Sequence, residues 1–180
     1  MKVIRNSSET IEHSLPIILT GFMGAGKSTI GKLLAEKLKR PFLDTDRILE
    51  EQTGMTVGQY IRRVGEEAFR RQENRSLSLA LGEESVVIAT GGGAVLNKLN
   101  RKRMLQKGWV CWLKAPAAVI LRRVDSVEGR PLLEGKNDLQ RVAKILADRN
   151  PYYEECHCQI DTTFKKPEQV LEEILQHYEE

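Results

Sequence analysis

Long hydrophobic runs are absent from this 180-residue chain, and no uninterrupted apolar stretch exceeds a few residues. Because a membrane-spanning helix needs about 20 consecutive apolar residues, we expect no membrane partner. Aromatic residues are also scarce, at 6%, and the net charge is only +3. Nucleic-acid-binding surfaces usually combine clustered basic residues with aromatic ones, so we expect no nucleic-acid partner and favour a small anionic ligand.

Cysteine is scarce as well, with three residues in the whole chain. Cys111 lies in an apolar run, while Cys156 and Cys158 flank His157 without the second pair of ligands that a tetrahedral zinc site requires. We interpret all three as reduced thiols. Residues 1–14 are polar and lack the apolar core of a signal peptide. We therefore expect a flexible leader at 1–14 and a cytoplasmic protein.

Short apolar runs that alternate with helical patterns indicate an α/β fold with a parallel sheet and helices on both faces. The apolar runs are those at residues 15–19, 42–43, 85–89, 110–113 and 159–161. Residues 15–180 are expected to form a single domain. Two consecutive helical stretches, at 57–64 and 66–81, lie in an insertion at about 45–82, and an aperiodic stretch at about 125–138 is expected to be a lid.

The glycine-rich segment after the first run matches the phosphate-binding pattern G-x-x-x-x-G-K-[ST]. It reads Gly21-Phe22-Met23-Gly24-Ala25-Gly26-Lys27-Ser28 and lies between an apolar run and a helical pattern, as this motif requires. In such a loop, backbone N–H groups surround phosphate oxygens, the lysine reaches the β- and γ-phosphates and the serine binds Mg²⁺. The segment predicts nucleotide binding but does not by itself distinguish a kinase from a motor, a switch or a binding module.

A guanine-nucleotide switch is disfavoured by what the rest of the chain lacks. No D-x-x-G turn occurs, and Asn97-Lys98-Leu99-Asn100 lacks the acidic residue of a guanine-binding motif. The segment Asp44-Thr45-Asp46 points instead towards phosphoryl transfer. In an extended segment the two carboxylates would point the same way, one towards Mg²⁺ and the other towards a substrate hydroxyl. The alternative is that Asp46 only caps a helix that begins near Arg47.

Arg70 lies in the inserted helical region, four residues after Glu66 and three before Glu73. The simpler interpretation is a surface array of ion pairs, worth a few tenths of a kcal/mol each. The functional interpretation is that these partners hold the Arg70 guanidinium for a substrate carboxylate, which it binds with two parallel hydrogen bonds.

Three consecutive glycines, Gly91, Gly92 and Gly93, follow the third apolar run. They favour close approach of a ligand to bare backbone, beside the phosphate loop at the carboxyl ends of the strands. Arg130 lies in the expected lid, where a cation would neutralise charge on the transferred phosphoryl group. The alternative for Arg130 is a solvated loop residue, and Arg149, near the end of a long helix, has a simple helix-dipole interpretation.

Taken in order, the motifs resemble those of the shikimate kinase family. They are G-x-x-G-x-G-K-S-T, D-T-D, F-R-x-x-E, G-G-G, R-P-L-L and R-x-P-x-Y, and they extend over about nine tenths of the chain. The resemblance implies a P-loop, nucleoside-monophosphate-kinase-like, three-layer fold with a central five-stranded parallel sheet and a lid. It also implies an enzyme that phosphorylates the 3-hydroxyl of shikimate with ATP and Mg²⁺, a step in chorismate and aromatic amino acid biosynthesis. Nothing in the pattern demands a partner chain, so we expect a monomer.

The resemblance also implies a role for each matching residue. Lys27, Asp46 and Arg130 would be catalytic, and Ser28 and Asp44 would bind Mg²⁺. The implied ATP-binding residues are Gly24, Ala25, Gly26, Lys27, Ser28, Thr29, Arg123 and Arg130. The implied shikimate-binding residues are Asp46, Arg70, Gly91, Gly92, Gly93 and Arg149, with Glu73 orienting Arg70. Residues 161–167 would form the adenine loop.

Three alternatives remain beside this interpretation. A gluconate-type kinase is the first, and D-T-D, F-R-x-x-E and R-P-L-L together argue against it. A nucleoside-monophosphate kinase is the second, although two arginines and a glycine triplet suit a carboxylate site better. The third is a catalytically inactive nucleotide-binding module, for which we would expect a lesion at Lys27, Asp46 or Arg130, and the sequence has none.

Overall fold

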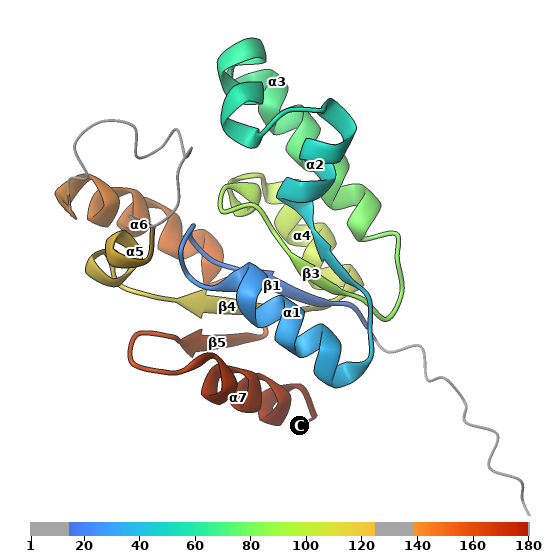
Figure 1. Ribbon diagram of the computed structural model, residues 1–180, viewed down its shortest axis with the longest axis vertical. Coiled ribbons are helices and arrows are strands. Elements are labelled where there is room, and N and C mark those ends of the chain that lie inside the picture. Colours follow the sequence, from blue (N-terminus) through green and yellow to red (C-terminus); the bar gives the residue numbers. More distant parts are fainter. Residues whose placement is uncertain (1–14, 125–138, 180) are drawn as a thin grey trace, which may run out of the picture.

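The structure, a computed structural model, describes residues 15–124 and 139–179. Its centre is a five-stranded, wholly parallel sheet with the strand order β2-β3-β1-β4-β5 (Figure 1). The strands are β1 (Ile17–Thr20), β2 (Phe42–Asp44), β3 (Val87–Ala89), β4 (Trp109–Lys114) and β5 (Cys158–Asp161). The predicted parallel sheet is therefore confirmed.

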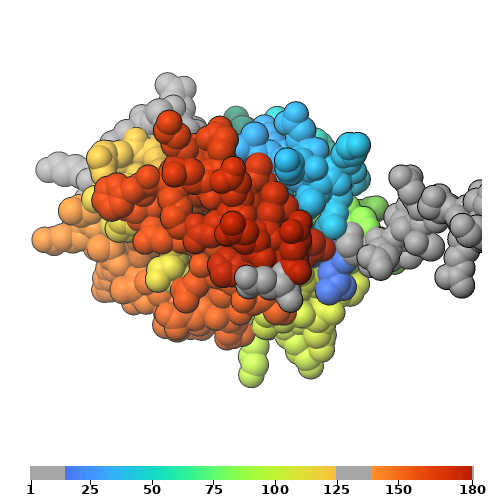
Figure 2. Space-filling model, turned by 90° about the horizontal axis from the view of Figure 1, so that it is seen from below, coloured from blue at the N-terminus to red at the C-terminus, as the bar shows by residue number. Residues whose placement is uncertain are grey.

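Helices cover both faces of this sheet (Figure 1). Successive strand residues point to opposite faces, so each strand contributes to two separate cores. Ile17 and Leu19 pack with α1 (Lys27–Leu38) and α7 (Pro167–Glu179), which lie side by side. Ile18 packs on the opposite face with residues of α3 (Val57–Ala80), α4 (Lys98–Lys107) and α6 (Leu139–Tyr153). Figure 2 shows the α7 side of the molecule, with α1 beside it.

The remaining elements connect these layers. They are α2 (Thr45–Thr53), the 3₁₀ helix η1 (Ala94–Leu96) and α5 (Ala117–Val124). The helical insertion comprises α2 and α3. Gly65, at φ 80° and ψ 167°, interrupts α3 and divides it into the two predicted stretches, because glycine adopts a positive φ without steric cost. A capping box between Thr56 and Gln59 begins α3.

Two strands begin later than predicted. β1 starts at Ile17 rather than residue 15, since Leu15 is 58% exposed and Pro16 has no N–H to donate. β3 starts at Val87 rather than residue 85, because Ser85 has a φ of 52°, outside the extended region. Neither shift changes the direction or the neighbours of its strand.

The carboxyl ends of all five strands lead into segments that carry the candidate residues, and in parallel sheets this edge binds ligands. The expected leader at 1–14 and the expected lid at 125–138, which includes Arg130, lie outside the described residues. Among the residues that are described, no helix is both long and apolar enough to cross a membrane.

Candidate active site

The phosphate loop connects β1 to α1. Gly24 and Gly26 have φ values of 75° and 102°, and Gly26 is the residue that precedes the first turn of α1. This conformation turns the loop around the helix N-terminus, which attracts anions. The Lys27 side chain is largely buried, and its Nζ donates hydrogen bonds to the carbonyl oxygens of Gly21 and Phe22, at 2.8 and 2.9 Å. The ammonium group therefore lies over the loop that is predicted to hold phosphates.

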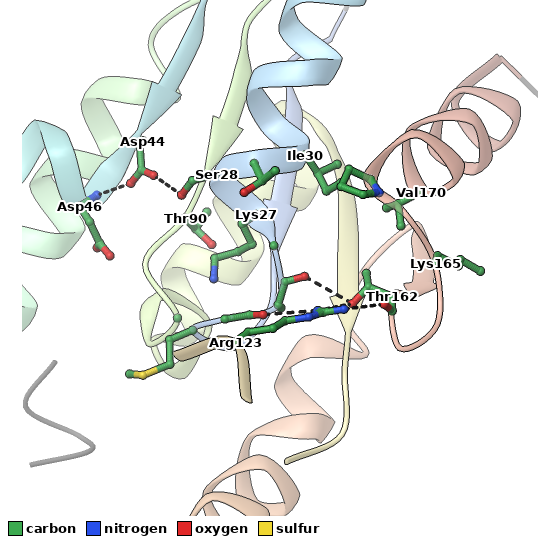
Figure 3. Close-up of a pocket in the computed structure, with 17 residues that line it drawn as sticks. Lys27, Ser28, Ile30, Asp44, Asp46, Thr90, Arg123, Thr162, Lys165 and Val170 are labelled. Carbon is green, nitrogen blue, oxygen red and sulfur yellow. Dashed lines mark hydrogen bonds between the residues drawn. The ribbon is translucent and has the colours of Figure 1, made fainter. Parts of the chain in front are cut away.

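Ser28 and Asp44 lie next to each other. Ser28 Oγ donates a hydrogen bond to Asp44 Oδ2 at 2.6 Å (Figure 3). Asp44 is also the N-cap of α2, because its Oδ1 accepts from the backbone N–H of Asp46 at 3.1 Å. The expected extended geometry of Asp44-Thr45-Asp46 is wrong: the helix begins at Thr45, so Asp46 is a first-turn residue. The expected alternative is also wrong, because Asp44 rather than Asp46 caps this helix.

Arg70 is held from two sides by carboxylates of its own helix. Its Nη1 donates to Glu73 Oε2 at 2.8 Å, and its Nε and Nη2 both donate to Glu66 Oε1, at 3.2 and 2.8 Å. The two partners differ in environment, since the Glu73 side chain is only 4% exposed and that of Glu66 is 67% exposed. Burial raises the pKa of Glu73 above its ordinary value, and the opposing effect of Arg70 offsets this only in part.

The glycine triplet lies against these side chains. A Cβ on Gly93 would lie 2.0 Å from Arg70 Nη1, and a Cβ on Gly91 would lie 2.7 Å from both Asp46 Oδ1 and Glu73 Oε1. The sequence led us to expect that the triplet leaves room for a ligand. At Gly91 and Gly93 the room is occupied by side chains of the protein itself, which brings Asp46, Glu73 and Arg70 to one place.

Two buried side chains, those of Thr45 and Arg149, form hydrogen bonds to the backbone of the glycine triplet. The hydroxyl of Thr45, which is 1% exposed, accepts a hydrogen bond from the Gly91 N–H at 2.9 Å. Arg149 Nη1 donates to the Gly92 carbonyl oxygen at 3.4 Å, and its guanidinium lies over the Phe22 ring at 5.5 Å. Arg149 is 8% exposed, so it lies inside the molecule, whereas the helix-dipole alternative requires only a solvated cation at the end of the helix.

Arg123 lies on the opposite side of the phosphate loop, at the end of α5. Its Nη1 donates to Thr162 Oγ1 at 3.0 Å and to the Gly24 carbonyl at 3.4 Å, and its Nη2 donates to the Thr162 carbonyl at 2.7 Å. Thr162 begins the loop between β5 and α7. Next to it, hydrogen bonds from Thr163 lower the pKa of Asp161 and hold the start of the expected adenine loop.

These parts surround a cavity of about 520 Å³ (Figure 3). Among the described residues, every predicted ATP-binding residue lines it, together with Asp44, Asp46 and Gly92. Arg70, Gly91, Gly93 and Arg149 are not among its lining residues, but they adjoin it through Gly92 and Asp46. The cavity thus extends from Arg123 to the carboxylates of Asp44 and Asp46, and Lys27 lies between them (Figure 3).

Comparison with known proteins agrees with this arrangement. The family model described as "Shikimate kinase" matches residues 23–179. A shikimate kinase of Thermodesulfovibrio yellowstonii is 40% identical over 163 residues, which are 91% of this chain and 94% of that protein. The chain belongs to the shikimate kinase family. A solved structure of the shikimate kinase from Acinetobacter baumannii in complex with shikimate matches with a TM-score of 0.88 at 38% identity, and the match covers 92% of this chain and 93% of that one.

More distant similarity concerns the fold alone. A gluconokinase of Sinorhizobium meliloti has a TM-score of 0.54 at 14% identity, and it covers 93% of each chain. The shikimate kinase fold of this chain is therefore the nucleoside-monophosphate-kinase-like α/β fold that was expected, and it is shared with kinases that act on other acceptors. Membership of the family, by contrast, depends on sequence similarity over nearly the whole chain.

Sequence reasoning missed three residues of this shikimate kinase site. Thr45, Tyr153 and Thr162 are buried polar residues, each with a hydrogen bond to a predicted site residue far away in the sequence. All three lie within segments that had been recognised: Thr45 in D-T-D, Tyr153 in R-x-P-x-Y and Thr162 in the expected adenine loop at 161–167. A hydroxyl residue within such a motif is the signal that would have drawn attention to them.

Proposed function

We propose that this chain transfers the γ-phosphoryl group of ATP to the 3-hydroxyl of shikimate, with ADP and shikimate 3-phosphate as products. The observation that carries this proposal is that Gly92 lies between the phosphate loop and a cluster of two arginines and two carboxylates. The cluster consists of Arg70, Arg149, Asp46 and Glu73. The loop suits ATP, and paired guanidinium groups suit the carboxylate of the acceptor. A hydroxyl of an acceptor bound there would approach the γ-phosphate from the side of Asp46.

In this proposal each candidate residue has a separate role in binding or transfer. Lys27 would turn from the loop carbonyls to the β- and γ-phosphate oxygens and stabilise the charge that they carry in the transition state. Asp46 would hold the attacking hydroxyl and accept its proton. Arg70 and Arg149 would grip the acceptor carboxylate, and Arg130 would close over the γ-phosphate from the lid. Arg123 would lie near the adenine.

The donor set of Ser28 and Asp44 fits Mg²⁺. Both groups present oxygen atoms, which Mg²⁺ prefers, and their hydrogen bond of 2.6 Å places those atoms side by side at the cavity. Bound there, the ion would neutralise phosphate charge during transfer. Asp44 also caps α2, so the carboxylate is already oriented towards this site by the fold.

The described candidate residues either line the cavity or adjoin it through Gly92 and Asp46. We also keep, as proposals, a monomeric cytoplasmic enzyme and a single domain at 15–180 with a leader at 1–14. The helical insertion at 45–82 and the lid at 125–138 would close over bound substrate, which excludes water and limits idle hydrolysis of ATP.

A coupled assay of ADP release with ATP and Mg²⁺ tests this proposal. Shikimate, gluconate, a nucleoside monophosphate and no acceptor are compared at equal concentration, and we expect release that depends on shikimate. Lys27→Ala, purified in parallel, reports any contaminating kinase. Release with gluconate or the monophosphate but not with shikimate would keep the phosphate loop and reject the acceptor. Binding of ATP without release in any arm would favour an inactive nucleotide-binding module.

A further inference from the structure

Tyr153, the last residue of α6, is buried beside the glycine triplet with 1% of its surface exposed. Its ring stacks on Trp112 of β4, with centroids 5.6 Å apart and planes 14° apart. A buried phenol requires a hydrogen-bond partner. The Tyr153 hydroxyl finds one in the Gly92 carbonyl oxygen, to which it donates at 2.5 Å.

The same carbonyl oxygen also accepts from Arg149, which lies one helical turn before Tyr153. That bond is 3.4 Å long, much weaker by its length than the bond from the hydroxyl. Tyr153 and Arg149 share one face of α6, since residues four apart lie above one another. The hydroxyl therefore sets the distance between this face and Gly92, and with it the place where the Arg149 guanidinium lies.

The surroundings of the hydroxyl keep it protonated. Burial raises the pKa of Tyr153 to about 12, with Arg149 and Arg70 opposing the shift and Glu73 adding to it. These four groups come from α3 and α6, the two helices that carry the acceptor arginines. The hydroxyl is consequently a permanent donor to Gly92 throughout the pH range in which kinases work.

We infer that Tyr153 is a positioning residue of the acceptor site, whose hydroxyl fixes Gly92 and so holds Arg149 where it meets the acceptor carboxylate. The inference rests on the proposed function, because it names the acceptor side of that site. The two ends of the Tyr153 side chain then have different roles. The ring stabilises the core by packing on Trp112, whereas the hydroxyl determines the affinity for the acceptor.

Tyr153→Phe tests this inference because it removes only the hydroxyl. We expect the KM for shikimate to rise about tenfold, the loss of one buried hydrogen bond, with the KM for ATP changed less than twofold. Tyr152→Phe is the matched control. Tyr152 is the preceding residue, is 37% exposed and packs its ring under the Arg101 guanidinium, so its variant should keep both KM values.

Trp112→Phe is the second variant and separates packing from positioning. It loosens the ring stack but leaves the Tyr153 hydroxyl in place, so we expect a lower Tm with an unchanged KM for shikimate. This variant also tests the inference if Tyr153→Phe does not fold. A raised KM for shikimate in Trp112→Phe would overturn the inference, because loose packing of the core would then be enough to weaken acceptor binding.

A further arm combines Tyr153→Phe with Arg149→Lys. If the hydroxyl acts through Arg149, the double variant should raise the KM for shikimate by less than the product of the two separate factors. Independent, multiplicative effects would overturn the inference. So would an unchanged KM in Tyr153→Phe when the wild-type chain phosphorylates shikimate. A wild-type chain without shikimate-dependent release would overturn the proposed function together with this inference.

Discussion

Glu66 occupies the edge of Arg70 that a substrate carboxylate would use. Its Oε1 accepts from both Nε and Nη2 of Arg70, which is the side-on pair that guanidinium offers to carboxylates. Buried Glu73 holds the remaining nitrogen, Nη1, at 2.8 Å. An acceptor carboxylate that binds this edge must therefore displace Glu66, and Glu66→Gln should make the displacement easier.

The magnitude follows from exposure. With 67% of the Glu66 side chain and 26% of the Arg70 side chain exposed, the pair belongs to the class worth about 0.2–1 kcal/mol. Relief of that competition corresponds to a KM for shikimate about 1.4- to 5-fold lower, since 1.4 kcal/mol is tenfold. The effect should shrink at about 0.5 M salt, where exposed charges are screened within a few ångströms. The KM for ATP should not change.

Steady-state kinetics at low and high salt, with shikimate varied at saturating ATP, measure this effect. Glu67→Gln is the matched control, because Glu67 pairs with Arg71 at the same helical spacing and is 90% exposed. A higher KM in Glu66→Gln would refute the reasoning and make Glu66 a support for Arg70. Equal changes in the KM for shikimate in the two variants would mean that the effect comes only from the loss of a negative surface charge.

Two other predictions concern buried groups. Because burial raises the pKa of Glu73 above its ordinary 4.5, the folded chain keeps the Glu73 proton to a higher pH than the unfolded chain does. The free energy of unfolding of the wild type should therefore fall relative to that of Glu73→Gln as the pH rises through and above 4.5. Urea unfolding at several pH values measures this, and the opposite trend would mean that the attraction of Arg70 outweighs burial. Thr162→Val, which removes one acceptor of Arg123, should raise the KM for ATP about three- to tenfold and leave that for shikimate unchanged, with Thr162→Ser restoring it.

Much of the site could be predicted because its parts are local in sequence. The phosphate loop is a run of consecutive residues, and the pairing of Arg70 with Glu66 and Glu73 follows from helical spacing alone. The order of apolar runs predicts a parallel sheet, and a parallel sheet brings the carboxyl ends of its strands to one edge. These arguments need no knowledge of the tertiary packing.

The contacts that sequence reasoning missed join residues that are far apart in the sequence. Tyr153 and Gly92 are 61 residues apart, and Thr45 and Gly91 are 46 apart, so only the packing of helices on the sheet brings them together. The error at Asp46 has a different origin. Whether a strand continues or a helix begins at Thr45 depends on the Asp44 carboxylate, which caps the helix here, and local patterns describe such boundaries poorly.

The glycine triplet shows how one motif can combine two causes. At Gly93 an added Cβ would meet the tip of the Arg70 side chain, and at Gly91 it would meet two carboxylates, whereas at Gly92 the nearest atom is the Met23 backbone nitrogen at 3.3 Å. Gly93→Ala should therefore displace Arg70 and raise the KM for shikimate about tenfold. Its Tm should change little, because a flexible side chain can move aside.

Gly92→Ala should behave differently from Gly93→Ala. The cost of its Cβ falls on backbone that must shift by a few tenths of an ångström, beside the phosphate loop rather than beside Arg70. We expect a lower Tm and a KM for ATP that rises at least as much as that for shikimate. If both variants instead impaired shikimate binding alone, the glycines would be required for direct approach of the acceptor, and the side chains that now fill the space at Gly93 would not be the reason for its identity.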